Sequence, residues 1–336
     1  MTNWDAIPAA ISSATNCSFT LRSKIPVRGG SINQSFRLEG TDGSRYFLKI
    51  NDAQHLPMFV AEAAGLAAIA ATNAIRVPKP ITHGTAGKQS YLVLEHLELS
   101  GRGDTRLLGE QLAALHRCTP LSLSSARVKD ITNDLSGAVS QPSRMASSFI
   151  RMRGEKESTE TLPCFGFAQD TFIGTTPQPN VWKTDWIAFW HEHRLGFQLG
   201  LAEKNGYGGK LQTLGEKILG ALPAFFEGYT PQPSLLHGDL WSGNHGFLAD
   251  GTPAIFDPAT YYGDRECDLA MTELFGGYST DFYSAYRAAY PLDTGYANRR
   301  ALYNLYHILN HANLFGGGYE RQAEGMMHKL LMEIHS

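Results

Sequence analysis

The sequence predicts an α+β fold with two lobes, a small lobe with a β-sheet and one helix, and a larger, mostly helical lobe. Two observations lead to this prediction. Short alternating segments separated by turn residues fill most of the first hundred positions, and helical periodicity dominates from about residue 184 onward. We place the small lobe at 1–98, with a hinge at 94–98, and the large lobe at 99–336.

The small lobe is predicted from period-two patterns and turn signals. Gly29-Gly30 and the Asp42-Gly43 pair interrupt the first alternating segments, and Asp-Gly is typical of a tight hairpin turn. Residues 57–72 show helical spacing and have Pro57 in the first turn, where its missing N–H costs nothing. The predicted strands are 18–27, 35–40, 45–51, 77–85 and 89–99.

The large lobe begins with a helix that Asp104 is predicted to cap and that runs to about Cys118. Residues 121–161 are rich in Ser and Thr and carry several basic side chains, which favours a flexible surface insertion. A functional basic arm is the alternative. Further helices are expected at 185–203, at 210–226 and from residue 268 to the end, with a β-rich pair between 235 and 264.

Composition excludes several classes of function. The chain has 336 residues, 43% of them hydrophobic and 18% charged, with a net charge of −3, so it has no basic surplus for nucleic acid. No apolar run approaches the length of a membrane span, and the first residues do not resemble a signal peptide. The four cysteines form no CxxC pair, and HEHR at His191 lacks the second histidine of HExxH. We expect a cytoplasmic protein.

The stretch LLHGDLWSGNHGF, residues 235–247, has the composition of a polar loop directly after an apolar strand. Asp239 and Asn244 lie in it, and Asp257 follows the apolar segment PAIF, so all three are predicted to meet at one end of a hairpin. Carboxylate and amide oxygens suit Mg²⁺, and a third group set apart could accept a proton, as phosphoryl transfer requires. The Asp-Leu-x-x-x-Asn spacing matches the catalytic loop of protein kinases. The alternative is that these residues only form turns.

Lys49 and Glu62 form a second predicted pair. Alternation puts Lys49 on one face of its strand with Phe47, and Glu62 lies on the apolar stripe of the next helix. A buried glutamate needs a cation, and Lys49 is the natural candidate. In a kinase this pair holds the lysine against the phosphates of the nucleotide. The alternative is a surface lysine and a half-exposed glutamate.

Two further contacts with the nucleotide are predicted to involve main-chain atoms only. Gly29, Gly30 and Ser31 could let the main chain approach phosphate, although a hairpin without ligand is an equal alternative. If the strand ending near 95 leads into the hinge, the carbonyl of Glu95 and the amide of Leu97 could bond an adenine edge.

These residues resemble the fructosamine kinase/ketosamine-3-kinase family, whose fold is protein-kinase-like and related to aminoglycoside phosphotransferases and choline kinases. The resemblance rests on HGDLWSGN (237–244), IFDPATYYGDRECDLAM (255–271), FGFAQDTFIGTTPQPN (165–180), DWIAFWHEHRL (185–195) and YHILNHANLFGGGY (306–319). GGSINQSF and EAAGLAAIA match in the small lobe, and the resemblance covers nearly all the chain outside 121–161.

The resemblance implies an ATP- and Mg²⁺-dependent kinase that phosphorylates O3 of ketosamines, on small amines or on glycated proteins, and thereby promotes deglycation. By position, Asp239 would be the base, Asn244 and Asp257 would hold Mg²⁺, and Lys49 with Glu62 would bind phosphate. Trp241 and His311 would contact the ketosamine, although a helical histidine is as often a core residue. Asp268 begins a helix and is expected to cap it or to brace the catalytic loop.

The chain departs from the family pattern at two places. Ser31 stands where some relatives carry cysteine, so no thiol switch is expected there, and the 121–161 segment is longer than the expected connection. Two other functions compete with a ketosamine kinase. One is another small-molecule kinase, of the aminoglycoside or choline type. The other is a nucleotide-binding regulator without turnover, which predicts the loss of a catalytic residue that this chain retains.

Overall fold

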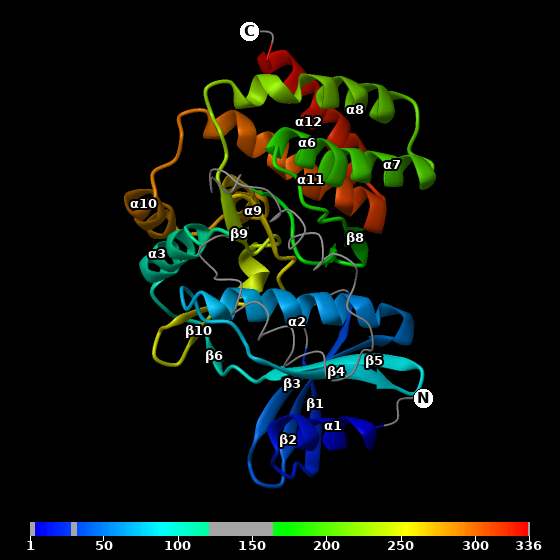
Figure 1. Cartoon of the computed structure of the whole chain (residues 1–336), viewed down its shortest axis with the longest axis vertical. Helices are drawn as coiled ribbons and strands as arrows, with labels where there is room; N and C mark the ends of the chain where they lie inside the picture. Colours follow the sequence, from blue (N-terminus) through cyan, green and yellow to red (C-terminus); the bar gives the residue numbers. More distant parts are fainter. Residues whose placement is uncertain (1–3, 28–31, 121–163, 335–336) are drawn as a thin grey trace, which may run out of the picture.

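The computed structural model describes residues 4–27, 32–120 and 164–334 and shows a sheet lobe below a larger helical lobe (Figure 1). The α+β prediction and the order of the lobes are therefore confirmed. Two sequence-based predictions lie outside the described residues: the phosphate-binding turn formed by Gly29, Gly30 and Ser31, and the insertion at 121–161.

The small lobe contains a five-stranded antiparallel sheet in the order β1-β2-β3-β5-β4. Each predicted strand is present, with ends that differ by a few residues from the alternating segments of the sequence. The strands are β1 (Leu21–Val27), β2 (Gln34–Gly40), β3 (Arg45–Asp52), β4 (Pro80–Ala86) and β5 (Gln89–Glu95).

Two helices cover this sheet, one on each face (Figure 1). The predicted helix is α2 (Leu56–Ala71), with a short 3-10 turn before it at Ala53–His55. The expectation of a single helix is wrong, because α1 (Ala6–Thr15) packs on the opposite face. Only Ile7 and Ile11 of α1 are buried, so its apolar stripe is too short to stand out in the sequence.

The helical lobe follows the predicted order. Its helices are α3 (Thr105–His116), α6 (Trp186–Trp190), α7 (Gly196–Lys204), α8 (Lys210–Ala221), α9 (Glu266–Leu274), α10 (Thr280–Ala289), α11 (Tyr296–Phe315) and α12 (Tyr319–Ile334). A π-helix at His191–Leu195 joins α6 to α7, and 3-10 turns occupy Leu222–Phe226 and Ser242–Asn244. Asp104 caps α3 as predicted, because its side chain accepts hydrogen bonds from the amides of Arg106 and Leu107.

Short strands complete the helical lobe. They are β6 (Leu99–Ser100), β7 (Thr171–Ile173), β8 (Thr176–Gln178), β9 (Pro233–Leu236), β10 (His245–Leu248), β11 (Pro253–Ile255) and β12 (Tyr261–Asp264). Strands β10 and β11 form the predicted hairpin, and β6 pairs with the edge of β10 that faces away from β11. Within the described ranges, no helix has both the length and the apolarity that crossing a membrane requires.

The β10–β11 hairpin also ties the lobes together. β6 follows directly after the end of the small lobe and pairs with β10. On the other side, Arg76 of the small lobe forms a bridge with Ala254 of β11, and its carbonyl accepts the amide of Ile255 at 3.0 Å. The segment that carries Asp257 is thus fixed to both lobes.

Candidate active site

A cavity of about 180 Å³ lies between the two lobes. Residues from β3, α2, the β7–β8 hairpin, the loop after β9 and the segment after β11 line it. It brings together six of the side chains predicted from the sequence: Lys49, Glu62, Asp239, Trp241, Asn244 and Asp257.

Lys49 joins the two lobes in this cavity. Its Nζ lies 2.6 Å from Oε1 of Glu62 and 2.7 Å from Oδ1 of Asp257, and its side chain is 5% exposed. Burial alone would lower the pKa of Lys49, but the charges of Asp257 and Glu62 outweigh it and hold that pKa above its ordinary value. Burial raises the pKa of Glu62 to about 7, with the Lys49 ammonium opposing the shift. The predicted pair is confirmed.

Asp257 stands directly after β11 and Phe256, in an unusual backbone conformation. Its φ is 61°, in the left-handed region that few residues other than glycine adopt. One of its carboxylate oxygens forms the ion pair with the Lys49 ammonium, while the side chain as a whole remains 45% exposed. Strained backbone of this kind persists where the surrounding structure fixes it, and it is concentrated at functional sites.

The catalytic-loop histidine, His237, links this segment to Asp239. Its Nε2 lies 2.9 Å from the carbonyl oxygen of Phe256, and its Nδ1 lies 3.2 Å from the amide of Asp239. A carbonyl can only accept, so Nε2 carries the proton and Nδ1 accepts. Burial lowers the pKa of His237, consistent with a neutral ring in this position.

Asp268 of α9 braces the same loop, as one of the two sequence-based readings predicted. Its carboxylate accepts the amides of His237 at 2.7 Å and Gly238 at 2.8 Å, and it also contacts Nε2 of His116 at 3.1 Å. Burial would raise the pKa of Asp268, but the hydrogen bond and charge of His116 and the other partners hold it below the ordinary value. Asp268 lies inside α9 and is not its N-cap.

Asp239 and Asn244 occupy the cavity side of the loop. Burial, then the charge of Asp257, raises the pKa of Asp239 to about 7, while a hydrogen bond from Asn244 opposes the shift. Nδ2 of Asn244 donates to the carbonyl of Asp239 at 2.7 Å and to its Oδ2 at 3.2 Å. This orientation leaves Oδ1 of Asn244 as the side-chain atom available to a cation.

Trp241 is exposed at the edge of the cavity, with 38% of its surface accessible. Its ring lies over Gly243, where an added Cβ would come within 2.3 Å of the indole, so a larger residue at 243 would displace the ring. His311 does not line the cavity. It lies on α11 and packs against Phe275, which also contacts Trp241, with ring centroids 5.1 and 6.5 Å apart.

The predicted hinge residues do not line this cavity either. The side chain of Glu95 forms an ion pair with Arg76, and its amide donates to the carbonyl of Lys79 at 2.8 Å. Leu97 lies in the irregular segment between β5 and β6. Their role in binding adenine therefore stays a prediction.

Sequence reasoning missed two side chains that hold the site in place. Gln178 is buried and donates from Nε2 to the carbonyl of Ala259 at 3.0 Å, while its Oε1 accepts the hydroxyl of Tyr306 at 2.7 Å. Arg194 emerges from the π-helix and donates to Oδ1 of Asn180 at 2.7 Å. Both residues lie in motifs that resemble the family, and this resemblance was the one sequence signal that could have pointed to their role.

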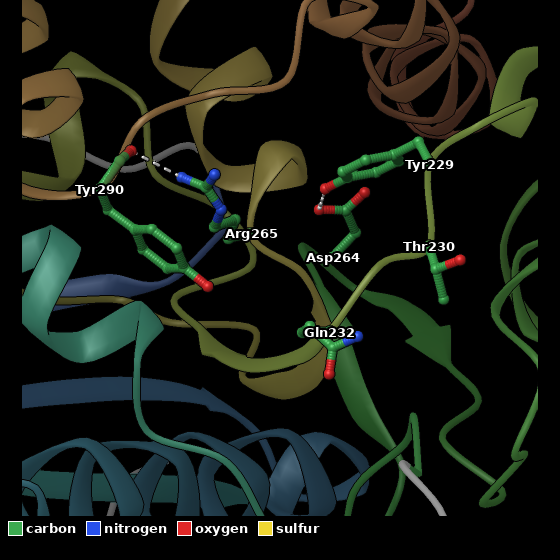
Figure 2. Close-up of a pocket in the computed structure, with 6 residues that line it drawn as sticks. All are labelled: Tyr229, Thr230, Gln232, Asp264, Arg265 and Tyr290. Carbon is green, nitrogen blue, oxygen red and sulfur yellow. Dashed lines mark hydrogen bonds between the residues drawn. The ribbon is translucent and has the colours of Figure 1, made fainter.

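A second, smaller pocket lies in the helical lobe away from the cleft (Figure 2). Asp264 in its wall accepts the hydroxyls of Tyr229 at 3.0 Å and Tyr303 at 2.6 Å. Arg265 donates to the carbonyl of Tyr290 at 3.0 Å and stacks over that ring at 3.6 Å. The charged groups of this pocket are therefore hydrogen-bonded or stacked within the protein.

The fold and the cleft together define a phosphotransferase of the protein-kinase-like class. A choline kinase of Streptococcus pneumoniae shares this fold, with a TM-score of 0.58 and 13% identity over 98% of this chain and 99% of its own. The crystal structure of a protein provisionally assigned as a fructosamine-3-kinase from Haemophilus somnus is more similar, with a TM-score of 0.78, 27% identity and 98% coverage of both chains.

Sequence comparisons specify the family. The family model of fructosamine kinase matches residues 3–152 and 143–333. A probable ketoamine kinase of Synechocystis is 43% identical over 98% of this chain and 97% of its own length. A chloroplastic protein-ribulosamine 3-kinase of Oryza sativa is 37% identical over 88% of this chain and 75% of its own length. The chain belongs to the fructosamine kinase family.

Proposed function

We propose that this protein transfers the terminal phosphoryl group of ATP to the O3 hydroxyl of ketosamines, on lysine side chains of glycated proteins or on small amines. The observation that carries the proposal is the junction at Lys49, whose ammonium contacts Glu62 from the small lobe and Asp257 from the large lobe within the cavity that Asp239 lines. A phosphoryl transferase needs this combination of cation, carboxylates and base in one cleft.

The nucleotide side of the cleft would be formed by Lys49 and the residues around it. Lys49, held by Glu62, orients phosphate oxygens in this proposal. Oδ1 of Asn244 and the exposed part of the Asp257 carboxylate are hard oxygen ligands that fit Mg²⁺. When bound, the ion would neutralise phosphate charge.

Asp239 is the proposed base. It lies in the cavity, and its pKa is raised to about 7, so near neutral pH it can accept a proton that a carboxyl of ordinary pKa would hold weakly. The hydrogen bond from Asn244 to Oδ2 orients the carboxylate. Its remaining oxygen is free to receive the proton of the sugar hydroxyl.

The sugar side would be formed by Trp241, with His311 behind it across Phe275. An exposed indole at the mouth of a polar cavity suits the C–H face of a sugar. The names of the ketoamine and ribulosamine kinases that this chain resembles support a ketosamine as the acceptor. Phosphorylation at O3 would make the sugar unstable and release the free amine.

We also propose that the protein acts in a reducing compartment such as the cytoplasm. No disulfide joins the four cysteines in the described structure, and burial raises the pKa of three of them, Cys118, Cys164 and Cys267. Such thiols have little tendency to react.

An ADP-release assay tests the activity directly. Ribulosyl-lysine and fructosyl-lysine derivatives are offered beside kanamycin and choline, and turnover of a ketosamine is expected. The Asp239→Asn variant should bind ATP nearly as well as the parent and turn over roughly 10²–10⁴-fold more slowly. Preferred turnover of kanamycin or choline, or full activity of Asp239→Asn, would contradict the proposal.

A further inference from the structure

Helix α2 lies between the sheet of the small lobe and the helical lobe (Figure 1), and it is linked to the segment that carries Asp257. In the middle of the helix, Glu62 is joined to Asp257 through the ammonium of Lys49. Beyond its end, Arg76 bridges Ala254 just before that segment. The helix and the stretch that follows it are therefore attached at two points to the chain around Asp257, the proposed metal ligand.

Between these two attachments lies Gly65. It is buried, and a Cβ built on it would lie 2.7 Å from Oγ1 of Thr260, 3.1 Å from Cβ of Thr260 and 3.6 Å from Cγ of Pro258. The first of these distances is shorter than real Cβ contacts, so a larger residue fits only if Thr260 or the helix shifts. The helix thus lies closer to the segment than a residue with a Cβ would allow without such a shift.

No hydrogen bond from the Thr260 side chain explains this contact. Its side chain is fully buried, and Oγ1 has no hydrogen-bond partner among the described residues. The contact therefore acts through distance and shape. Glycine inside a helix is unfavourable compared with alanine, and here it stands in an alanine-rich helix, EAAGLAAIAA. A close approach explains a glycine that helix propensity disfavours.

We propose that Gly65 is a positioning residue for phosphoryl transfer: its contact with Thr260 sets the spacing between α2 and the Asp257 segment, so that Lys49 reaches both carboxylates. Glu62 lies one helical turn before Gly65, so any shift of the helix at Gly65 moves Glu62 with it. Lys49 bridges two carboxylates at 2.6 and 2.7 Å, and a displacement of the helix must lengthen one of those contacts.

The inference rests on the proposed kinase activity and is tested with Gly65→Ala. The added methyl improves helix propensity and displaces α2 from Thr260. We expect kcat to fall about 10–100-fold, the range that a displacement near 1 Å can cause. The KM for ATP should rise, whereas the KM for the ketosamine should stay within about twofold, because Trp241 lies on another element.

A matched control and a second-site variant make the test decisive. Gly325→Ala changes a glycine of α12 that has no atom within 4 Å of a built Cβ, and it should leave every parameter unchanged. Thr260→Ala removes the atom at 2.7 Å, so the Gly65→Ala/Thr260→Ala variant should recover most of the lost kcat. The double variant also tests the proposal if Gly65→Ala alone does not fold.

Three outcomes would overturn the proposal: an unchanged kcat in Gly65→Ala, a double variant that folds yet remains as slow as the single one, or equal changes in both KM values. Calorimetric titration with ATP and Mg²⁺ separates this proposal from the proposed function, because it needs no sugar. Weaker nucleotide binding in Gly65→Ala would support the positioning role even if no ketosamine were a substrate.

Discussion

The two pockets of this protein are lined by similar residue types and differ in how those residues are satisfied. In the cleft, Asp257 has a left-handed backbone and a carboxylate that is 45% exposed, and Asp239 has a pKa raised to about 7. In the smaller pocket, Asp264 is fully buried and accepts the hydroxyl of Tyr229 (Figure 2), the hydroxyl of Tyr303 and the amide of Glu266. The cleft keeps polar groups available, and the smaller pocket does not.

This difference indicates which polar groups of the protein are available for a reaction. Buried polar groups that bond each other stabilise a fold, and their removal should appear mainly as a loss of stability. Polar groups that remain available beside strained backbone have a cost in stability that a ligand or a reaction can offset. Substitutions around the cleft should therefore change activity beyond their effect on stability, and substitutions around the smaller pocket should not.

Among substitutions that leave the proposed base in place, the largest effect is expected at Gly238, in the loop that carries Asp239. Its φ is 84°, and an added Cβ would lie 2.2 Å from the carbonyl oxygen of Ala259, against which the loop packs. Gly238→Ala must move either the loop with Asp239 or the segment with Asp257. We expect kcat/KM to fall at least about 100-fold, measured by ADP release at saturating nucleotide.

Gly251→Ala is the control that separates the steric clash of an added Cβ from the strain of a left-handed backbone. Gly251 also has a φ of 84°, but the nearest atom to its built Cβ is Cα of Gly103 at 3.9 Å. This variant should lose about 1 kcal/mol of stability and keep its activity. If both variants lost activity equally, left-handed strain alone would explain the effect, and the close packing of the catalytic loop would not matter.

The sequence was sufficient to predict the parts of the site that depend on local spacing. Asp239, Asn244 and Asp257 could be placed together because a polar loop and a short apolar strand bring them to one hairpin end. Lys49 and Glu62 could be paired because a glutamate on an apolar helical stripe needs a cation. In this second case the period of the strand and of the helix decides which side chain faces the interior.

The parts that escaped prediction depend on which backbone atom lies opposite a residue. Gln178 and its partner Ala259 are 81 positions apart, and the role of Gly238 follows from the carbonyl of Ala259. No periodicity specifies such contacts. Helix α1 escaped for another reason, since two buried isoleucines are too few to form a recognisable stripe.

A smaller effect is expected from Asp268→Asn, which acts on the cleft through the backbone of the loop that carries Asp239. Asp268 accepts three hydrogen bonds with two oxygens, and asparagine offers only one oxygen. One loop amide should lose its acceptor, with a cost of about 1–3 kcal/mol. We expect kcat to fall about tenfold and the KM for ATP to change little, because the Lys49 contacts are untouched.

Asp104→Asn is the matched control for this variant. Asp104 also accepts two backbone amides, at the start of α3, and asparagine caps a helix about as well as aspartate. Its stability and kcat should match those of the parent protein. A kcat for Asp268→Asn equal to that of the parent would show that the loop keeps its geometry without the brace.

The smallest effect on activity is expected from Tyr229→Phe in the second pocket. The substitution removes a hydroxyl that donates to Asp264 at 3.0 Å, while the hydroxyl of Tyr303 remains at 2.6 Å and the Arg299 guanidinium still stacks over the ring at 3.7 Å. Loss of one hydrogen bond to a buried carboxylate should reduce the free energy of unfolding by about 1–2 kcal/mol. Chemical denaturation measures that change, and steady-state assays should give unchanged kcat and KM values. A fall in kcat without a change in stability would mean that this pocket, despite its internally bonded groups, takes part in the reaction, and the distinction between the two pockets would then fail.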